Sequence, residues 1–298
     1  MSKKVRVLVL RSAGTNCNEE TAFAFSRCGA EAEQVHINVL LAGECRLADY
    51  HILALAGGFS YGDDIASGRI LANELRLKLG NDLKRFIADG KLIIGICNGF
   101  QILVKAGILP GLKLSKGSSF AKASAGRPTK ASAGRQEATL FNNDSAKFEA
   151  RWVHLQIENN ACVWTKGMPA QIYLPVAHGE GKFIPRDKNV LQLLDKNAQV
   201  VFRYCASDGG KPGYPDNPNG STDDIAGICD PTGRVLGLMP HPERHFLFTQ
   251  HPFWPRLRQG FGVQAHQGFG GQARLDKEFG DGAKIFENGI NYVRENLL

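Results

Sequence analysis

Residues 92–101 read LIIGICNGFQ, an aliphatic run that ends in a cysteine placed between two glycines. The run is typical of a buried strand. Gly95-x-Cys97-x-Gly99, followed at once by a helix-like segment, is the pattern of a nucleophile elbow. Glycines are needed there because side chains would collide with neighbouring backbone in so tight a turn. We expect the Cys97 thiol to project into a cleft, and a buried structural cysteine is the alternative.

The helix that follows the elbow, predicted to begin near Asn98, favours chemistry at this thiol. Its first backbone N–H groups and its positive dipole end favour a thiolate over a thiol. The same N–H groups can stabilise an oxyanion. The backbone of Asn98 is therefore a candidate for one half of an oxyanion hole.

Strand-like and helix-like segments alternate on both sides of the elbow through the first half of the chain. This alternation predicts an α/β fold with a mostly parallel central sheet and helices on both faces. In such sheets ligands bind at the carboxyl ends of the strands, where residues 57–64 and Cys97 fall. The predicted strands are 5–10, 33–37, 50–58 and 91–96, and the predicted helices are 19–29, 66–79 and 82–90.

The second half of the chain is richer in short β-like pieces broken by Gly, Asn and Pro. It predicts a smaller, partly antiparallel β-rich extension, a hairpin over 224–243 with the turn DPTG, and a last helix over 282–296. The β-like pieces are 138–144, 151–159, 161–167, 171–183 and 199–205.

Two stretches repeat themselves with a period of eight residues, KASAGR within 122–135 and QGFGxQA within 259–273. Two repeats are too few for a solenoid, which needs at least three stacked units. We expect a single domain, 1–298, with low-complexity surface insertions near 115–135 and 258–276. An interaction patch built on Phe261 and Phe269 is the functional alternative.

Composition narrows the class of protein. The 298 residues are 43% hydrophobic and 22% charged, with a net charge of +7 and no basic block, which argues against nucleic-acid binding. No apolar stretch is long enough for a membrane span, and the apolar start reads as a first strand and not as a signal peptide. Seven irregularly spaced cysteines suggest neither a disulfide framework nor a metal site. We expect a cytoplasmic protein.

A base for the thiol is expected in LMPHPERHF, residues 238–246. If the segment is extended, His241 and Glu243 point to the same side, so the carboxylate can orient the imidazole. His245 is a competing base in the same stretch, and a lone His beside Pro is often an ordinary surface residue.

GGFSYGDD, residues 57–64, is the third element. Gly57 and Gly58 leave backbone N–H groups exposed at a strand end, where they could form the other half of the oxyanion hole. Phe59, Ser60 and Tyr61 could line a small pocket. A phosphate cradle is the alternative, but the chain carries neither GxGxxG at this loop nor GxxxxGK[ST].

Taken together, these elements resemble the class I (triad) glutamine amidotransferases. Six motifs are similar to those of the glutaminase subunits of phosphoribosylformylglycinamidine synthase. They are GTNCNEET, GGFSYGDD, GICNGFQIL, RWV, LPVAHGEGKF and LMPHPER. The resemblance spans 4–114, 136–257 and 280–298, and the two repeat-bearing stretches depart from it.

The resemblance implies a role for each matching residue. Cys97 matches the nucleophile, His241 the general base and acid, and Glu243 the orienting carboxylate. The oxyanion hole matches backbone N–H groups at Gly58 and Asn98. The glutamine pocket is implied at Phe59, Tyr61, Gln101, His178 and Glu180.

The resemblance also implies a reaction. Glutamine is hydrolysed through a γ-glutamyl thioester, and ammonia passes to a large ATP-dependent synthetase subunit that converts formylglycinamide ribonucleotide to the amidine in purine synthesis. No cofactor is expected in this chain, ATP and magnesium are expected on the partner, and a small accessory subunit is left open. The alternatives are a glutaminase subunit for a different synthetase, another cysteine hydrolase or chaperone-like protein, and a non-catalytic scaffold.

Overall fold

The computed structural model describes residues 4–112, 136–158, 161–258 and 278–298. Their main feature is a nine-stranded sheet in the order β2-β1-β3-β4-β11-β10-β9-β6-β7. Its strands are β1 (Arg6–Arg11), β2 (Glu31–His36), β3 (Ile52–Leu55), β4 (Leu92–Ile96), β6 (Glu149–Ile157), β7 (Gln171–His178), β9 (Val200–Cys205), β10 (Ile225–Cys229) and β11 (Val235–Leu238). A separate pair, β5 (Ala138–Phe141) and β8 (Lys182–Pro185), is antiparallel.

The parallel half of the sheet comprises β2, β1, β3, β4 and β11. Every residue of β3 and β4 is buried, as their unbroken aliphatic sequences predict for strands that are covered on both faces. The remaining strands, β10, β9, β6 and β7, pair antiparallel. The predicted α/β class and mostly parallel sheet are confirmed, and the antiparallel strands extend the same sheet.

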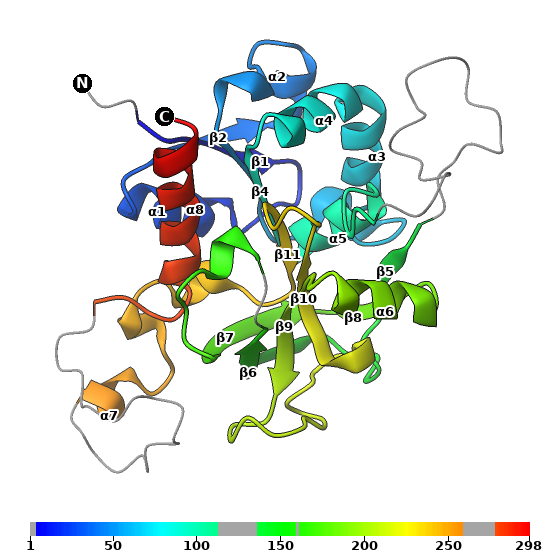
Figure 1. Cartoon of the computed structure of the whole chain (residues 1–298), viewed down its shortest axis with the longest axis vertical. Helices are drawn as coiled ribbons and strands as arrows, with labels where there is room; N and C mark the ends of the chain where they lie inside the picture. Colours follow the sequence, from blue (N-terminus) through cyan, green and yellow to red (C-terminus); the bar gives the residue numbers. More distant parts are fainter. Residues whose placement is uncertain (1–3, 113–135, 159–160, 259–277) are drawn as a thin grey trace.

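Helices lie on both faces of this sheet (Figure 1). The pair α1 and α8 packs together on one face, and α3 packs with α5 on the other. The helices are α1 (Asn18–Arg27), α2 (Ile37–Leu41), α3 (Arg69–Lys78), α4 (Gly80–Ala88), α5 (Asn98–Lys105), α6 (Lys188–Lys196), α7 (Trp254–Arg258) and α8 (Ala283–Asn296).

One predicted β-like piece, 161–167, is wrong. Its centre is the 3₁₀ turn η3 (Val163–Thr165), and Trp164 is fully buried beneath α8. The indole Nε1 of Trp164 donates to the carbonyl oxygen of Arg234 at 3.0 Å. Asn288 of α8 donates to the Trp164 carbonyl at 3.0 Å. The β-like composition therefore reflects a buried turn and not a strand.

Three helices were not predicted, α2, α6 and α7. The signal for α6 was available, because Asp187 caps its first turn by accepting a hydrogen bond from the backbone N–H of Val190 at 3.0 Å. The hairpin and the last helix are confirmed as β10–β11 and α8. The insertions predicted near 115–135 and 258–276 lie outside the described residues, apart from Arg258.

The topology brings four parallel strands to the same edge of the sheet. The chain leaves β1, β3, β4 and β11 at their carboxyl ends, and residues 12–17, 57–64, 97 and 239–241 follow these ends directly. This is the edge at which ligands bind in open α/β sheets. Among the described helices none is long and apolar enough to cross a membrane.

We expect Gly99→Ala to lower the free energy of unfolding by about 2–3 kcal/mol, because a Cβ there would lie 2.0 Å from the carbonyl oxygen of Leu55. Gly80→Ala is the matched control, since a Cβ at Gly80 meets no atom within 4 Å. Urea unfolding of the two variants measures the difference. Equal midpoints would contradict the role given to Gly99.

Candidate active site

Cys97 occupies the turn between β4 and α5. Its φ of 52° and ψ of −105° are unusual for a residue with a side chain and cost on the order of 1–3 kcal/mol. Its backbone N–H donates to the carbonyl oxygen of Leu238 at 2.8 Å, which ties the turn to β11. The buried thiol lies 3.6 Å from the carbonyl oxygen of Ala177 on β7. The elbow predicted from the two glycines is therefore present.

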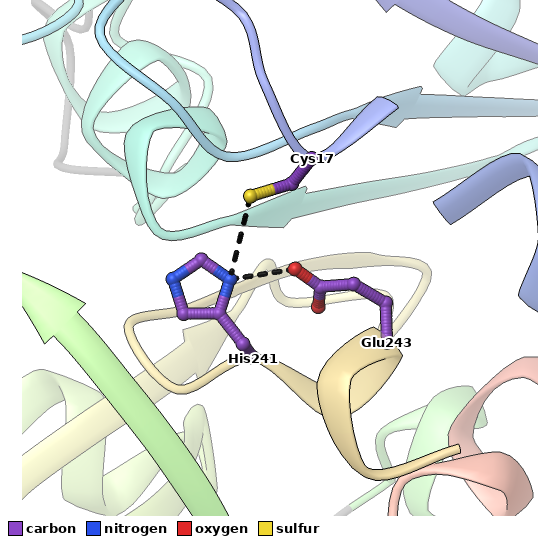
Figure 2. Close-up of side chains that lie close together, drawn as sticks. All are labelled: Cys17, His241 and Glu243. Carbon is purple, nitrogen blue, oxygen red and sulfur yellow. Dashed lines mark hydrogen bonds and ion pairs between the residues drawn. The ribbon is translucent and has the colours of Figure 1, made fainter. Parts of the chain in front are cut away.

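His241 and Glu243 form a buried pair. Nδ1 of His241 lies 2.6 Å from Oε1 of Glu243, and the two residues are 2% and 0% exposed (Figure 2). The backbone N–H of His241 donates to the carbonyl oxygen of Pro175 at 2.8 Å. The prediction of an extended segment is wrong, because Pro242–His245 forms the 3₁₀ helix η5. This turn still brings the carboxylate back to the imidazole.

The charges around His241 favour its protonated form. Burial lowers the pKa of His241, but the negative charge of Glu243 and then that of Cys97 outweigh burial and raise this pKa well above its usual value. A buried carboxylate that orients an imidazole beside a thiol is the arrangement that activates a nucleophilic cysteine. The structure thus brings Cys97, His241 and Glu243 together.

Gly57 lies where these groups converge. A Cβ at Gly57 would lie 2.8 Å from Cε1 of His241, 3.2 Å from Sγ of Cys17 and 3.5 Å from Cβ of Cys97. Gly58 has a φ of 140°, and a Cβ there would lie 2.6 Å from the carbonyl oxygen of Gly14. Gly58 is therefore required by the close approach of neighbouring backbone, and Gly57 by the close approach of the side chains of the site.

The side chain of Asn98 joins the elbow to the loop after β3. Its Oδ1 accepts hydrogen bonds from the backbone N–H of Ser60, at 3.2 Å, and from the Ser60 hydroxyl. Its Nδ2 donates to Oε1 of Gln101 at 2.9 Å and to Oδ1 of Asp63 at 3.3 Å. These bonds fix the start of α5 against the Gly57–Gly58 loop. Ser60, which we expected to line the pocket, is buried and supports the elbow instead, and Asp63 is a supporting residue that the sequence did not reveal.

The residues predicted for the pocket face different surroundings. Gln101 is buried and donates to the carbonyl oxygen of Glu180 at 2.5 Å. The Tyr61 hydroxyl donates to Oε2 of Glu74 at 2.7 Å, and burial and this contact raise the pKa of Tyr61 to about 12. Phe59 is 44% exposed, with its ring 6.2 Å from that of Phe148. Tyr61 is thus engaged with α3, whereas Phe59 lies at the surface.

His178 is a buried, neutral imidazole. Nδ2 of Asn143 donates to the carbonyl oxygens of His178 and Lys147, both at 2.8 Å, so Oδ1 of Asn143 is an acceptor. That Oδ1 lies 3.1 Å from Nδ1 of His178, which must therefore carry the ring proton. Burial, followed by the charge of His241, lowers the pKa of His178 to about 3. Its Nε2 is left as a buried acceptor near the charged site.

His245, the competing base, points elsewhere. Its Nδ1 lies 2.7 Å from the carbonyl oxygen of Tyr173, and its ring packs edge-on against Trp152 at 5.0 Å. These contacts favour His241 as the base for Cys97.

Cys17 was not predicted as a site residue. It follows β1, and its Sγ lies 3.9 Å from Nδ1 of His241 and 3.1 Å from a guanidinium nitrogen of Arg244. Its position at the carboxyl end of a parallel strand was the signal that could have identified it.

Comparisons with known proteins show which family the chain resembles. Residues 4–293 match the model of the CobB/CobQ-like glutamine amidotransferase domain. The phosphoribosylformylglycinamidine synthase subunit PurQ of Dehalococcoides mccartyi is 46% identical over 294 residues, covering 98% of this chain and 99% of that protein. The PurQ subunit of Archaeoglobus fulgidus is 38% identical over 303 residues, covering 98% of each chain.

Solved structures show the same fold. A chain in the structure of PurLQS from Thermotoga maritima superimposes with a TM-score of 0.64 at 29% identity, covering 98% of this chain and 100% of that one. A glutamine amidotransferase from Thermotoga maritima has a TM-score of 0.50 at 14% identity, covering 99% of this chain and 100% of that one, which shows the fold alone.

We expect His178 to make the fold sensitive to acid. The unfolded chain takes up a proton at His178 near its ordinary pKa of 6.5, whereas the folded chain does so only near 3, so acidification favours unfolding across this range. Between pH 7.5 and 5.5 this residue should cost about 1.4 kcal/mol of stability. Urea unfolding at both pH values should show that His178→Asn removes this part of the pH dependence. An equal loss of stability in both proteins would contradict the assignment.

Proposed function

The chain belongs to the CobB/CobQ-like glutamine amidotransferase family, and from this premise we propose that it is the glutaminase subunit of phosphoribosylformylglycinamidine synthase. It releases ammonia from glutamine for the synthesis of formylglycinamidine ribonucleotide in purine biosynthesis. The relatives carry the name of this synthase, so a glutaminase subunit for a different synthetase is not favoured. The observation that carries the chemistry is the convergence of Cys97 and the buried His241–Glu243 pair around Gly57.

The first half of the reaction forms a thioester. The thiolate of Cys97 attacks the side-chain amide carbon of glutamine, and the oxygen of the tetrahedral intermediate is stabilised by the backbone N–H groups of Gly58 and Asn98. His241 donates its proton to the departing nitrogen, so ammonia leaves and a γ-glutamyl thioester remains on Cys97. Glu243 holds the imidazole through Nδ1 and stabilises its positive charge.

The second half regenerates the thiol. His241, now neutral, removes a proton from a water molecule that attacks the thioester carbon. The new tetrahedral intermediate occupies the same oxyanion hole, and its collapse expels Cys97 and releases glutamate. Gln101 and His178 contribute to the glutamine pocket, where the unprotonated Nε2 of His178 can accept a hydrogen bond.

The ammonia is consumed by a partner. The chain acts with the large synthetase subunit PurL and the small subunit PurS, the partners in the PurLQS assembly to which it is similar. We place the ATP and magnesium of the synthetase reaction on the large subunit and assign no cofactor to this chain. We also propose that the complex acts in the cytoplasm, because the nucleotides on which the synthase acts are soluble. Free hydrolysis wastes glutamine, so the isolated chain should be a poor glutaminase.

Glutamate release should rise strongly when the purified chain is mixed with PurL, PurS, ATP and formylglycinamide ribonucleotide. Cys97→Ala should abolish this activity, by at least about 10³-fold, because it removes the nucleophile. The same mixture should still make the amidine when ammonium replaces glutamine, which shows that the large subunit is active, and gel filtration with PurL and PurS shows whether the variant is folded and assembled. Cys205→Ala, which removes another buried thiol, is the matched control. Glutamine-dependent synthesis that survives Cys97→Ala would overturn the proposal.

Glu243→Gln should lower kcat for glutamine hydrolysis in the complex by roughly 10²- to 10⁴-fold, with little change in KM. The amide keeps a polar group beside Nδ1 but removes the charge that favours protonated His241. Steady-state kinetics with glutamine measure the two constants. A rise in KM at unchanged kcat would instead indicate that Glu243 acts in binding.

A further inference from the structure

One ring nitrogen of the catalytic imidazole, Nδ1 of His241, faces both a thiol and a carboxylate. Sγ of Cys17 lies 3.9 Å and Oε1 of Glu243 2.6 Å from the same atom, Nδ1 of His241. The three donor atoms all lie within 4.8 Å of one another, and all three residues are buried. Figure 2 shows the thiol and the carboxylate approaching this ring nitrogen from two directions.

Cys17 is held in this position by its surroundings. Its backbone N–H donates to the carbonyl oxygen of Gly57 at 3.2 Å, and the Thr21 hydroxyl donates to its carbonyl oxygen at 2.6 Å. The sulfur also contacts Oδ1 of Asn16 and a guanidinium nitrogen of Arg244, both at 3.1 Å. The thiol therefore faces His241 without any change in the loop after β1.

Thiolate, imidazole and carboxylate are the ligands that zinc prefers in proteins. Tetrahedral coordination with bonds of about 2.0–2.3 Å separates neighbouring ligand atoms by about 3.3–3.8 Å. The 3.9 Å between Cys17 Sγ and His241 Nδ1 is close to this spacing. The His241–Glu243 contact would have to open by about 0.7 Å, which a small rotation of the Glu243 side chain can supply.

We propose that Cys17, His241 and Glu243 form a zinc-binding site whose occupation switches off glutamine hydrolysis. Coordination displaces the protons of the Cys17 thiol and of Nδ1, which pass to the solvent, and breaks the hydrogen bond that orients the ring. A ring with Zn²⁺ on Nδ1 carries added positive charge, so Nε2 becomes a poor acceptor for the proton it must exchange at the Cys97 side. The inhibitory consequence rests on the proposed function, whereas metal binding does not.

The positive charge of Arg244 limits how tightly the metal binds. Its guanidinium lies against the sulfur and close to the carboxylate of Glu20, at 3.5 Å. It favours the thiolate that the metal needs, and it also repels the metal. The site is therefore suited to reversible inhibition by free zinc and not to a permanent structural ion.

Cobalt(II) replaces zinc in such sites and reports thiolate ligation by an ultraviolet charge-transfer band. We expect titration of the full chain to give this band with one equivalent of Co²⁺. Cys97→Ala should keep the band and Cys17→Ala should lose it, with Cys45→Ala, a half-buried thiol elsewhere, as the matched control. A band that persists without Cys17, or that disappears with Cys97, would place the metal elsewhere and overturn the proposal.

The inhibitory effect is tested in the assembled complex. Zn²⁺ should inhibit glutamine-dependent synthesis, a chelator should reverse the inhibition, and ammonium-dependent synthesis should continue. Relative to its own uninhibited rate, Cys17→Ala should need at least about tenfold more Zn²⁺ for half inhibition. Equal zinc sensitivity in both proteins would overturn the inhibitory role. Failure of the proposed function would appear differently, as cobalt binding through Cys17 in a protein that does not hydrolyse glutamine.

Discussion

Close backbone packing at the carboxyl ends of β1, β3, β4 and β11 is the constraint on which the site depends. Gly99 lies against the carbonyl of Leu55, and Gly57 lies against His241, Cys17 and Cys97. A methyl group at either position would push apart the strand ends that hold the reacting groups. The glycines therefore set the distance between nucleophile and base, while the aliphatic strands behind them supply the rigidity.

This packing also places charge where water is excluded. Glu243 is fully buried, and a buried carboxylate is tolerated only when it is paired. Its partner is His241, which is buried as well and whose pKa Glu243 and Cys97 both raise. The pair is strongly coupled because little water screens it. His178, under the same burial but beside a positive imidazole, is driven to the neutral form. Two histidines near one site thus take opposite protonation states for reasons that their surroundings supply.

The sequence identified the main residues of the candidate site but not the local structure and contacts around them. The elbow and the HPE stretch carry local patterns, so Cys97, His241 and Glu243 could be chosen from spacing and from family resemblance. The 3₁₀ turn of η5 could not be predicted in this way, because prolines on both sides of a histidine suit an extended segment equally well. Cys17 and Asp63 lie at the carboxyl ends of parallel strands, which was an available signal, but the contacts that give them their roles join distant segments and leave no local pattern. The prediction of a β-like piece at residues 161–167 failed because tertiary packing beneath α8 overrode their β-like composition.

β7 is an edge strand of the described sheet, and backbone groups on its outer side are bonded to segments at and around the site. The backbone N–H of Tyr173 bonds to Asp281 and its carbonyl faces His245. Pro175 has no N–H, and its carbonyl accepts from His241. The carbonyl of Ala177 faces the thiol of Cys97. An uncovered strand of this length is a template for aggregation through added strands. The segments that perform the chemistry thus also protect the protein from self-association, and a mutation that loosens them would expose the chain to precipitation as well as to loss of activity.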